Sequence, residues 1–354
     1  MANADCIVIE GSNMAECHPV GFQWVVEAKK RGARIIHVDP RYTRTSAFAN
    51  RHIGIRGGTD VVLLGAIIKY MLDNELYFHD YVVSYTNASS IISPDYQDTE
   101  DLDGLFSGYD PETGKYVTDS WQYVRKPEGS SWNVEKDETL QHPNSVFQIL
   151  KRHYSRYTPE LVEETCGISQ EDFYYLANSI ADNSKPDRTT CFAYALGFTQ
   201  HTLGAQFIRT AAILQLLMGN VGRPGSGIMA LRGHASIQGS TDIPTLFNSL
   251  PGYLPMPHVN LQSWKDYVNT FRKEDQKGFW QIGENYAVSL MKSYWGDAAT
   301  AENEWGYNLM PRISGAHSTY ETLMAMLEHE VEGYIVFGQN PAVAQSNGGM
   351  QRRG

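Results

Sequence analysis

The sequence predicts an α/β protein with Rossmann-like, mostly parallel sheets and helices on both faces. Short apolar runs at 5–10, 34–38 and 189–196 have the length of buried strands. The segment between the first two runs has the character of a helix, which gives a complete βαβ unit of about 35 residues. Strands that alternate with helices in this way form parallel sheets.

The first unit begins with the strand at 5–10, followed by a loop that leads to Pro19. Proline suits the first position of a helix, because that position has no use for a backbone N–H. The helix is expected to end near Arg31, since basic residues complement its dipole there and Gly32 follows. The strand at 34–38 closes the unit.

A third strand is predicted at 53–55, and Thr59 or Asp60 caps the helix that follows it. Residues from about 75 to 187 are rich in Tyr, Asp and Ser. We interpret them as an insertion that elaborates the sheet. Helices are expected inside it at 144–156 and 159–183.

The sheet resumes after the insertion with a strand at 189–196 and a loop at 197–203. The next segment, 204–218, is apolar nearly all round, which predicts a central helix. Residues 244–330 are irregular with helical patches. A final buried strand is predicted at 334–337.

The composition argues against several classes of function. The chain of 354 residues has a net charge of −11 and only short basic runs, so no nucleic-acid partner is expected. No stretch approaches the roughly 18 apolar residues of a membrane span. Residues 1–6 lack the features of a signal peptide. The four cysteines form no CxxC pattern, so the chain offers no zinc, iron–sulfur or other metal site by itself.

Open parallel sheets bind ligands at the carboxyl ends of their strands. The first loop at that edge, 11–18, offers polar side chains from Asn13, Glu16 and His18. It leads into a helix N-terminus, which favours phosphate, but it lacks the G-x-G-x-x-G pattern of a standard dinucleotide turn. The alternative is an ordinary loop capped by Asn13 or Ser12.

The second strand ends at Asp39, where a Rossmann-like unit places a carboxylate that accepts from ribose hydroxyls. Such a carboxylate can equally accept from a guanine amine. Arg41 and Thr43 follow it and add donors for an anion. The alternative is a strand end whose arginines are simply solvated.

Two later loops complete the set. The loop at 197–203 carries Gln200 and His201 as polar tips, although a lone loop histidine is often structural. The loop at 338–341 follows the last predicted strand. Asn340 in it can equally bridge backbone groups of its own turn.

Arg232, His234 and Gln238 lie in a small-residue loop, 230–242, that follows a glycine-rich turn. No hydrophobic period runs through this loop, so it cannot pack a core, and its polar side chains are expected to bind something. A planar guanidinium can hold a carboxylate through two hydrogen bonds. The alternative is an arginine satisfied by backbone carbonyls of the turn.

Together these loops resemble the bis-molybdopterin-guanine-dinucleotide enzymes of the dimethyl sulfoxide reductase superfamily. The loop at 230–242, with Leu-Pro-Gly-Tyr-Leu-Pro at 250–255, is most similar to formate dehydrogenase large subunits. The resemblance covers nearly the whole chain and implies the central domains of a molybdopterin oxidoreductase. It also implies a bis-molybdopterin guanine dinucleotide cofactor with molybdenum or tungsten, and oxidation of formate to carbon dioxide.

The resemblance implies roles for individual residues. Arg232 would orient formate, with His234 beside it, as the catalytic residues of this chain. Contacts to one guanine dinucleotide are implied for Asn13, Glu16, His18, Asp39, Arg41, Thr43, Gly58 and Asp60. Contacts to a pterin are implied for Gly197, Phe198, Gln200 and His201, with Gly233 as a further cofactor contact. The second, pseudo-symmetric dinucleotide site would use Gly338, Gln339 and Asn340.

The same resemblance predicts the domain organisation. Residues 1–235 would form a Rossmann-like guanine-dinucleotide-binding domain, and 236–354 part of a second α/β dinucleotide-binding domain truncated at its C-terminus. In that family the metal ligand and the 4Fe–4S cysteines lie upstream of the first loop. We therefore expect both outside this chain, and we expect the isolated chain to be inactive.

The implied partners are formate, an iron–sulfur electron-transfer subunit and, as a further candidate, a membrane cytochrome subunit. A periplasmic location is favoured over a cytoplasmic one. Two other functions stay open. The absent G-x-G-x-x-G argues against an NAD-dependent dehydrogenase. The intact loop at 232–238 argues against a cofactor-free structural or electron-transfer homologue of the complex I large-subunit type.

Overall fold

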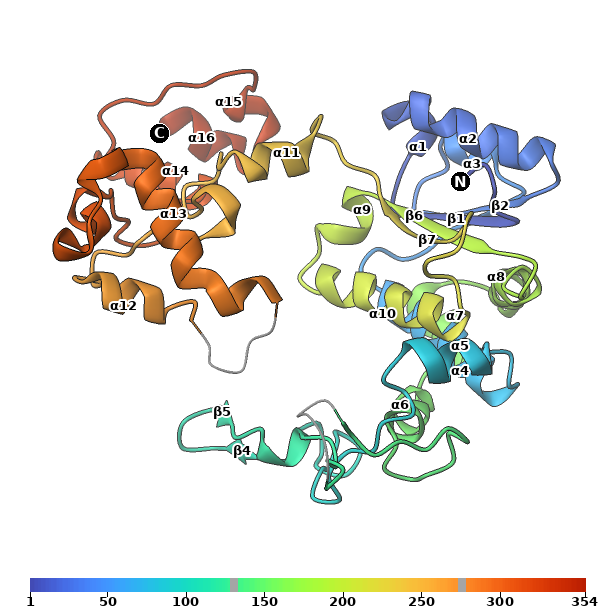
Figure 1. Cartoon of the computed structure of the whole chain (residues 1–354). Coiled ribbons are helices and arrows are strands. Elements are labelled where there is room, and N and C mark those ends of the chain that lie inside the picture. The colour runs from blue at the N-terminus through green and yellow to red at the C-terminus, as the bar shows by residue number, and fades with distance from the viewer. Residues whose placement is uncertain (128–132, 273–277) are drawn as a thin grey trace. The chain divides into compact units, whose positions relative to one another are not determined.

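Five parallel strands form one sheet in the order β3-β2-β1-β6-β7 in the computed structural model of the protein (Figure 1). The structure describes residues 1–127, 133–272 and 278–354. The chain forms two compact units, Met1–Arg232 and Gly233–Gly354, and the sheet belongs to the first. Its strands are β1 (Cys6–Glu10), β2 (Arg34–Val38), β3 (Arg51–Ile53), β6 (Thr190–Tyr194) and β7 (Gly227–Ala230).

The strands direct alternate side chains into two apolar clusters, one on each face of the sheet. Cys6, Val8 and Phe192 belong to one cluster, whereas Ile7 and Ile9 belong to the other. Both faces are therefore buried, which explains why these strands are continuous apolar runs in the sequence. The predicted α/β fold with a parallel sheet is confirmed.

Helices cover both faces of the sheet (Figure 1). On one face, Phe22 and Val25 pack into the cluster that contains Ile7. On the other face, two apolar helices, α4 (Asp60–Asp73) and α10 (Gly204–Leu217), pack against each other. The helices of the first face are α1 (Met14–Cys17), α2 (Pro19–Lys30) and α3 (Arg44–Phe48). Those of the second include α4 (Asp60–Asp73), α7 (Pro159–Cys166), α8 (Gln170–Asp182) and α10 (Gly204–Leu217), the predicted central helix.

The elements of the first unit differ from the predicted ones in detail. The third strand covers 51–53 and not 53–55. The region 159–183, where helices were predicted, contains two, because Gly167 ends α7 in the left-handed conformation at φ +71°. The strand β7 was not predicted, since Gly227 and its neighbours have the composition of a glycine-rich turn.

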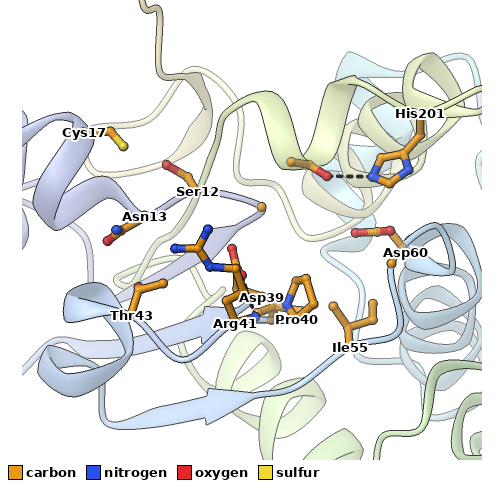
Figure 2. Close-up of a pocket in the computed structure, with 14 residues that line it drawn as sticks. Ser12, Asn13, Cys17, Asp39, Pro40, Arg41, Thr43, Ile55, Asp60 and His201 are labelled. Carbon is orange, nitrogen blue, oxygen red and sulfur yellow. Dashed lines mark hydrogen bonds between the residues drawn. The ribbon is translucent and has the colours of Figure 1, made fainter. Parts of the chain in front are cut away.

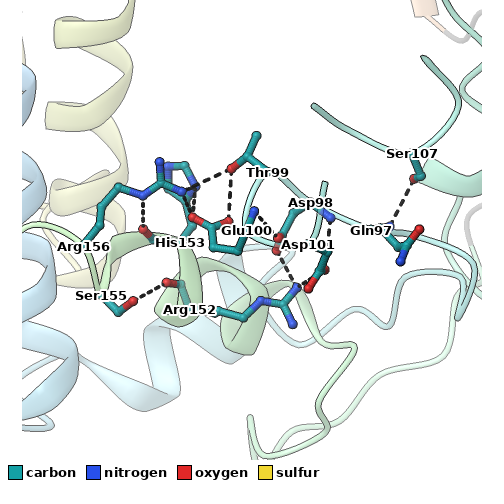
Figure 3. A network of polar contacts seen from close by, with 10 residues as sticks. All are labelled: Gln97, Asp98, Thr99, Glu100, Asp101, Ser107, Arg152, His153, Ser155 and Arg156. Atoms are coloured by element: carbon teal, nitrogen blue, oxygen red, sulfur yellow. Dashed lines mark hydrogen bonds and ion pairs between the residues drawn. The ribbon is translucent and has the colours of Figure 1, made fainter. Parts of the chain in front are cut away.

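The segment between α5 (His79–Tyr85) and α6 (Val146–Tyr154) extends away from the sheet (Figure 1). It contains a short antiparallel pair, β4 (Tyr109–Asp110) and β5 (Lys115–Tyr116), and a 3-10 turn, Asp119–Trp121. A polar network joins it to α6 (Figure 3). Arg152 of α6 donates to Asp98 at 2.5 Å and to Asp101 at 3.2 Å. The Asp98 side chain is only 3% exposed, so Arg152 compensates a buried charge.

Arg152→Ala is expected to loosen this segment without unfolding the sheet. Asp98 would keep the backbone N–H of Glu100 as a partner but lose its counter-charge. We expect a local cost of about 1–2 kcal/mol, because Arg152 itself is partly exposed. Amide hydrogen exchange at 98–105 should therefore accelerate roughly 5- to 30-fold. Lys151→Ala on the same helix is the control, and equal exchange in both variants would contradict the prediction.

The unit Gly233–Gly354 has a core that is rich in aromatic residues. Tyr267 and Tyr307 stack with ring centroids 5.3 Å apart, and their hydroxyls donate to the carbonyls of Pro255 and Leu261. Its α-helices are α11 (Ile237–Asp242), α12 (Trp264–Asn269), α13 (Gly283–Trp295), α14 (Thr319–Leu327), α15 (Pro341–Ala344) and α16 (Gly348–Arg353). Its 3-10 helices are Pro251–Tyr253, Gly278–Ile282, Gly296–Ala298 and Ala301–Leu309.

The prediction of a strand at 334–337 is wrong. Ile335 and Phe337 are 79% and 87% exposed, and these residues pair with no strand in the described part of the chain. A strand needs a neighbour for its backbone groups, and the described residues of this unit form no sheet that supplies one. The assignment of 236–354 to a second α/β domain stays a prediction.

Candidate functional site

A cavity of about 380 Å³ lies at the carboxyl ends of β1, β2, β3 and β6 (Figure 2). The loops that follow these strands form its walls, as the parallel sheet predicts. Its volume falls within the range of about 300–1,000 Å³ typical of small-molecule sites. The lining residues are Gly11, Ser12, Asn13, Cys17, Val38, Asp39, Pro40, Arg41, Thr43, Ile55, Gly57, Asp60, Gly197 and His201.

Two of the lining loops touch each other through their backbones. The N–H of Gly197 donates to the carbonyl of Gly11 at 3.0 Å. A Cβ on Gly11 would lie 2.5 Å from the nitrogen of Phe198, and a Cβ on Gly197 would lie 2.7 Å from the oxygen of Gly11. Gly11 also has φ +61°, which other residues rarely adopt. Glycine at both positions therefore brings the β1 and β6 loops together.

The buried ring of His37 joins the segments behind the cavity. Its Nδ1 lies 2.7 Å from the Ser46 hydroxyl, and its Nε2 lies 3.1 Å from the carbonyl oxygen of Ser12. Because a carbonyl only accepts, Nε2 carries the proton and Nδ1 accepts from Ser46. Burial lowers the pKa of His37 despite the neighbouring Asp39, so the ring is neutral at pH 7. It fixes the β1 loop against the β2 loop.

Asp39 and Arg41 place opposite charges beside the cavity. The Asp39 carboxylate accepts from the backbone N–H of Arg41 at 2.8 Å, which fixes its orientation. The guanidinium of Arg41 lines the cavity and makes no hydrogen bond or ion pair with any described residue. It can therefore bind an anionic group such as a phosphate, while Asp39 accepts from N–H or O–H donors.

Asn13 ties the β1 loop to the start of α3. Its side-chain oxygen accepts from the Thr45 hydroxyl at 3.0 Å, and that hydroxyl also accepts from the N–H of Ala15 at 2.9 Å. The Asn13 amide donates to Glu16, whose carboxylate pairs with Arg44 at 3.3 Å. Asn13 lines the cavity, whereas Glu16 lies outside the lining and supports the loop.

Asp60 and His201 form another wall of the cavity, where they lie near each other (Figure 2). Asp60 begins α4 and is 4% exposed. His201 donates from Nε2 to the carbonyl of Gly197 at 2.9 Å. Burial raises the pKa of Asp60, and His201 acts in the opposite direction. Gly58 is adjacent, since a Cβ there would lie 3.9 Å from Nδ1 of His201.

Three residues near the cavity have buried polar atoms without a hydrogen-bond partner in the described part of the chain. These atoms are Oγ of Ser12, Nδ1 of His18 and both carboxyl oxygens of Glu10. Ser12 lines the cavity and is 5% exposed. Buried polar groups are nearly always hydrogen-bonded, so a polar ligand in the cavity would satisfy this hydroxyl.

Two other predicted residues follow β6 but do not line the cavity. Phe198 is fully buried and packs against Tyr194 and Phe207, so its side chain belongs to the core. Gln200 is exposed at the end of α9 (Leu196–Thr199), a short helix inside the loop predicted at 197–203.

The predicted substrate loop lies at the junction of the two units. Arg232 and His234 are exposed there, as is Gly233. Nδ1 of His234 is 2.6 Å from the carbonyl oxygen of Ala235, while the guanidinium of Arg232 contacts no acceptor among the described residues. The predicted second-site residues are exposed just before α15, namely Gly338, Gln339 and Asn340. None of these six predicted residues lines the cavity.

The loops alone did not predict several residues of the site, among them the polar residues Ser12, His37 and Glu10. The last two share a signal in the sequence. Each is a titratable residue inside an otherwise apolar strand, RIIHV or CIVIE. Such groups are seldom buried without a partner or a function, so they mark the strands whose ends form a site.

The part of the chain that the structure describes contains no group of three or more His, Cys, Asp or Glu side chains that could hold a metal ion. All four cysteines are unpaired, and Cys17 is the exposed one. Within the same residues, no helix has the length and apolar character needed to cross a membrane.

The chain is similar to proteins of known family. Residues 1–351 match the family model described as molybdopterin oxidoreductase. The sequence is 45% identical over 348 residues to the major subunit of the nitrate-inducible formate dehydrogenase of Escherichia coli K12. That match covers 97% of this chain and 34% of the relative.

Two further similarities concern another curated relative and a solved structure. Formate dehydrogenase 2 subunit alpha (cytochrome c-553) of Nitratidesulfovibrio vulgaris is 40% identical, over 96% of this chain and 34% of the relative. Among solved structures, acetylene hydratase from Pelobacter acetylenicus matches with a TM-score of 0.42 and 18% identity, over 63% of this chain and 22% of that chain. The chain spans about a third of the length of the curated relatives that it matches.

Proposed function

The chain belongs to the molybdopterin oxidoreductase family, and we propose that it is the guanine-dinucleotide-binding and substrate-orienting part of a formate dehydrogenase. In that reaction formate loses two electrons and one proton and becomes carbon dioxide. Identity of 40–45% to formate dehydrogenase subunits supports this substrate. The cavity at the carboxyl ends of four strands is the observation that carries the proposal.

The cavity fits a guanine nucleotide in its chemistry. Arg41 offers a phosphate a guanidinium that has no partner among the described residues, while Asp39 and Asp60 offer acceptors for guanine N–H groups or ribose hydroxyls. The unpartnered hydroxyl of Ser12 adds a donor and an acceptor. The further residues of this dinucleotide site are Asn13, Glu16, His18, Thr43 and Gly58.

The other predicted residues complete the proposal. Gly197, Phe198, Gln200 and His201 would contact a pterin, with the side chain of Phe198 serving as support from the core, and Gly233 would be a further cofactor contact. Gly338, Gln339 and Asn340 would belong to a second dinucleotide site. When bound, a molybdenum or tungsten pterin cofactor supplies the two-electron redox chemistry.

Arg232 would hold the formate carboxylate with a planar, bidentate-capable cation, and His234 would lie beside it. This is positioning and charge stabilisation, and it moves no proton.

The electrons would pass to an iron–sulfur subunit and, where present, a membrane cytochrome subunit. The 4Fe–4S cluster of the catalytic subunit would lie outside this chain, and export to the periplasm with the partner is the proposed location.

The nucleotide proposal can be tested with guanosine diphosphate, titrated into the 354-residue chain and followed by calorimetry. Arg41→Ala and Asp39→Ala should each weaken binding roughly 10- to 100-fold, because each removes a charge-assisted hydrogen bond. Arg31→Ala is the matched control, since that arginine lies at the end of α2 and donates to Asn3. It should leave the affinity unchanged.

Titration with NADH distinguishes the main rival. Preference for the guanine nucleotide supports the proposal, because the first loop lacks the standard pyrophosphate turn. Tighter binding of NADH, or equal loss of affinity in the Arg31 and Arg41 variants, would contradict it.

A further inference from the structure

Glu10 is an ionisable residue at a buried position, where a charge is costly. It ends β1, is 1% exposed, and neither of its carboxyl oxygens has a hydrogen-bond partner among the described residues. Alternation along the strand turns it toward the face of Cys6 and Val8, whose apolar cluster also contains residues of α4. Asp60, the first residue of α4, lines the same cavity as Gly11, which directly follows Glu10, and its carboxyl group is the one that acts on Glu10.

Two carboxyl groups buried together do not both ionise, because desolvation and mutual repulsion penalise the second charge. Burial, and next the charge of Asp60, raise the pKa of Glu10 well above its ordinary range. Burial raises the pKa of Asp60 as well, but its own backbone N–H, the neighbouring Glu10 carboxyl group, the His201 ring and the backbone N–H of Gly58 counteract this effect. Asp60 therefore has donors for its charged form, and Glu10 lacks them.

The other titratable groups around this pair do not change the assignment. His37 and Asp39 of β2 interact with each other, 3.7 Å apart. Cys166 of α7 donates from Sγ to the carbonyl of Thr59, and burial raises the pKa of its thiol. None of these groups places a positive charge against Glu10 in the described part of the chain.

We propose that Glu10 and Asp60 share one proton held on Glu10, which makes Glu10 a positioning residue and Asp60 the single anion at this wall of the cavity. Glu10 does not line the cavity and acts only through Asp60. A second negative charge here would repel a phosphate-bearing ligand, whereas one anion accepts its N–H or O–H groups. The proton assignment itself needs no ligand, and only the choice of nucleotide as ligand rests on the proposed function.

Glu10→Gln tests the assignment, because an amide mimics the neutral acid in shape and in donating ability. The folded state holds the proton to higher pH than the unfolded chain does. The stability due to Glu10 is therefore complete below the ordinary glutamate pKa and is lost as the pH rises toward the raised folded pKa.

Urea unfolding of the wild type and Glu10→Gln between about pH 5 and pH 8 should show this difference. The unfolding equilibrium constant of the wild type should rise with pH relative to that of the variant, by about tenfold per pH unit wherever the folded state keeps the proton and the unfolded chain does not. Glu27→Gln, at an exposed ion pair with Lys30 on α2, is the control and should follow the wild type. Parallel curves for wild type and Glu10→Gln would overturn the inference.

Infrared spectroscopy gives a second measurement that does not depend on how well the variant folds. The wild type at neutral pH should show the C=O stretching band of a protonated carboxylic acid, with glutamate assigned by isotope labelling. Absence of that band would overturn the inference.

Affinity for guanosine diphosphate should also fall as the pH rises in the wild type and stay flat in Glu10→Gln. Failure of the wild type to bind the nucleotide would contradict the nucleotide proposal, while the infrared and unfolding results would still decide the proton assignment.

Discussion

Arg232→Lys is expected to lower kcat/KM for formate about 30- to 1,000-fold in the active enzyme that contains this chain. Lysine keeps the positive charge but loses the planar fork that matches a carboxylate. The loss corresponds to about 2–4 kcal/mol of transition-state stabilisation, the typical worth of a charge-assisted bidentate contact in a partly dry site. Steady-state kinetics measures the effect, and metal and pterin content should stay near wild type.

Asp39→Ala provides the contrast for this experiment. Asp39 lines the cavity, and we expect its removal to lower cofactor occupancy first and activity only as a consequence. Arg232 contacts no acceptor among the described residues, so its replacement should not disturb the fold. If Arg232→Lys loses cofactor while activity per bound metal stays constant, Arg232 is a structural residue and the substrate assignment fails.

The parallel sheet of the first unit was predictable because burial on both faces produces apolar runs in the sequence. The strands at 5–10 and 34–38 follow from this rule, and the cavity follows from the rule that loops at the carboxyl ends meet. Asn13, Asp39 and His201 were brought to one cavity from separate parts of the chain, as that argument expected.

The rest depends on partners that a local pattern does not reveal. Residues 334–337 are as apolar as a buried strand, yet without a neighbouring strand among the described residues they stay exposed. Strand β7 shows the reverse case, since it begins at Gly227, in a segment with turn composition, and forms because β6 offers a free edge. Glu10 is a third case, because only packing against α4 reveals that it meets Asp60.

Gly11→Ala is expected to destabilise the first unit by about 2–4 kcal/mol. Part of this cost is the left-handed backbone, at φ +61°, which is unfavourable for alanine by about 1–2 kcal/mol. The rest arises because the new Cβ would lie 2.5 Å from the nitrogen of Phe198 and force the loops apart, which breaks the hydrogen bond from Gly197. Thermal unfolding should shift down by roughly 5–15 °C.

Gly32→Ala separates the two contributions, because Gly32 also has a positive φ, +96°, but a Cβ there meets nothing within 4 Å. It should cost only the backbone strain, about 1–2 kcal/mol, and leave affinity for guanosine diphosphate unchanged. Gly11→Ala should lose both stability and affinity, since the contact with Gly197 sets the separation of the Ser12 and His201 walls. Equal destabilisation by the two variants would mean that the loops can move apart without cost, and the cavity would then not depend on this contact.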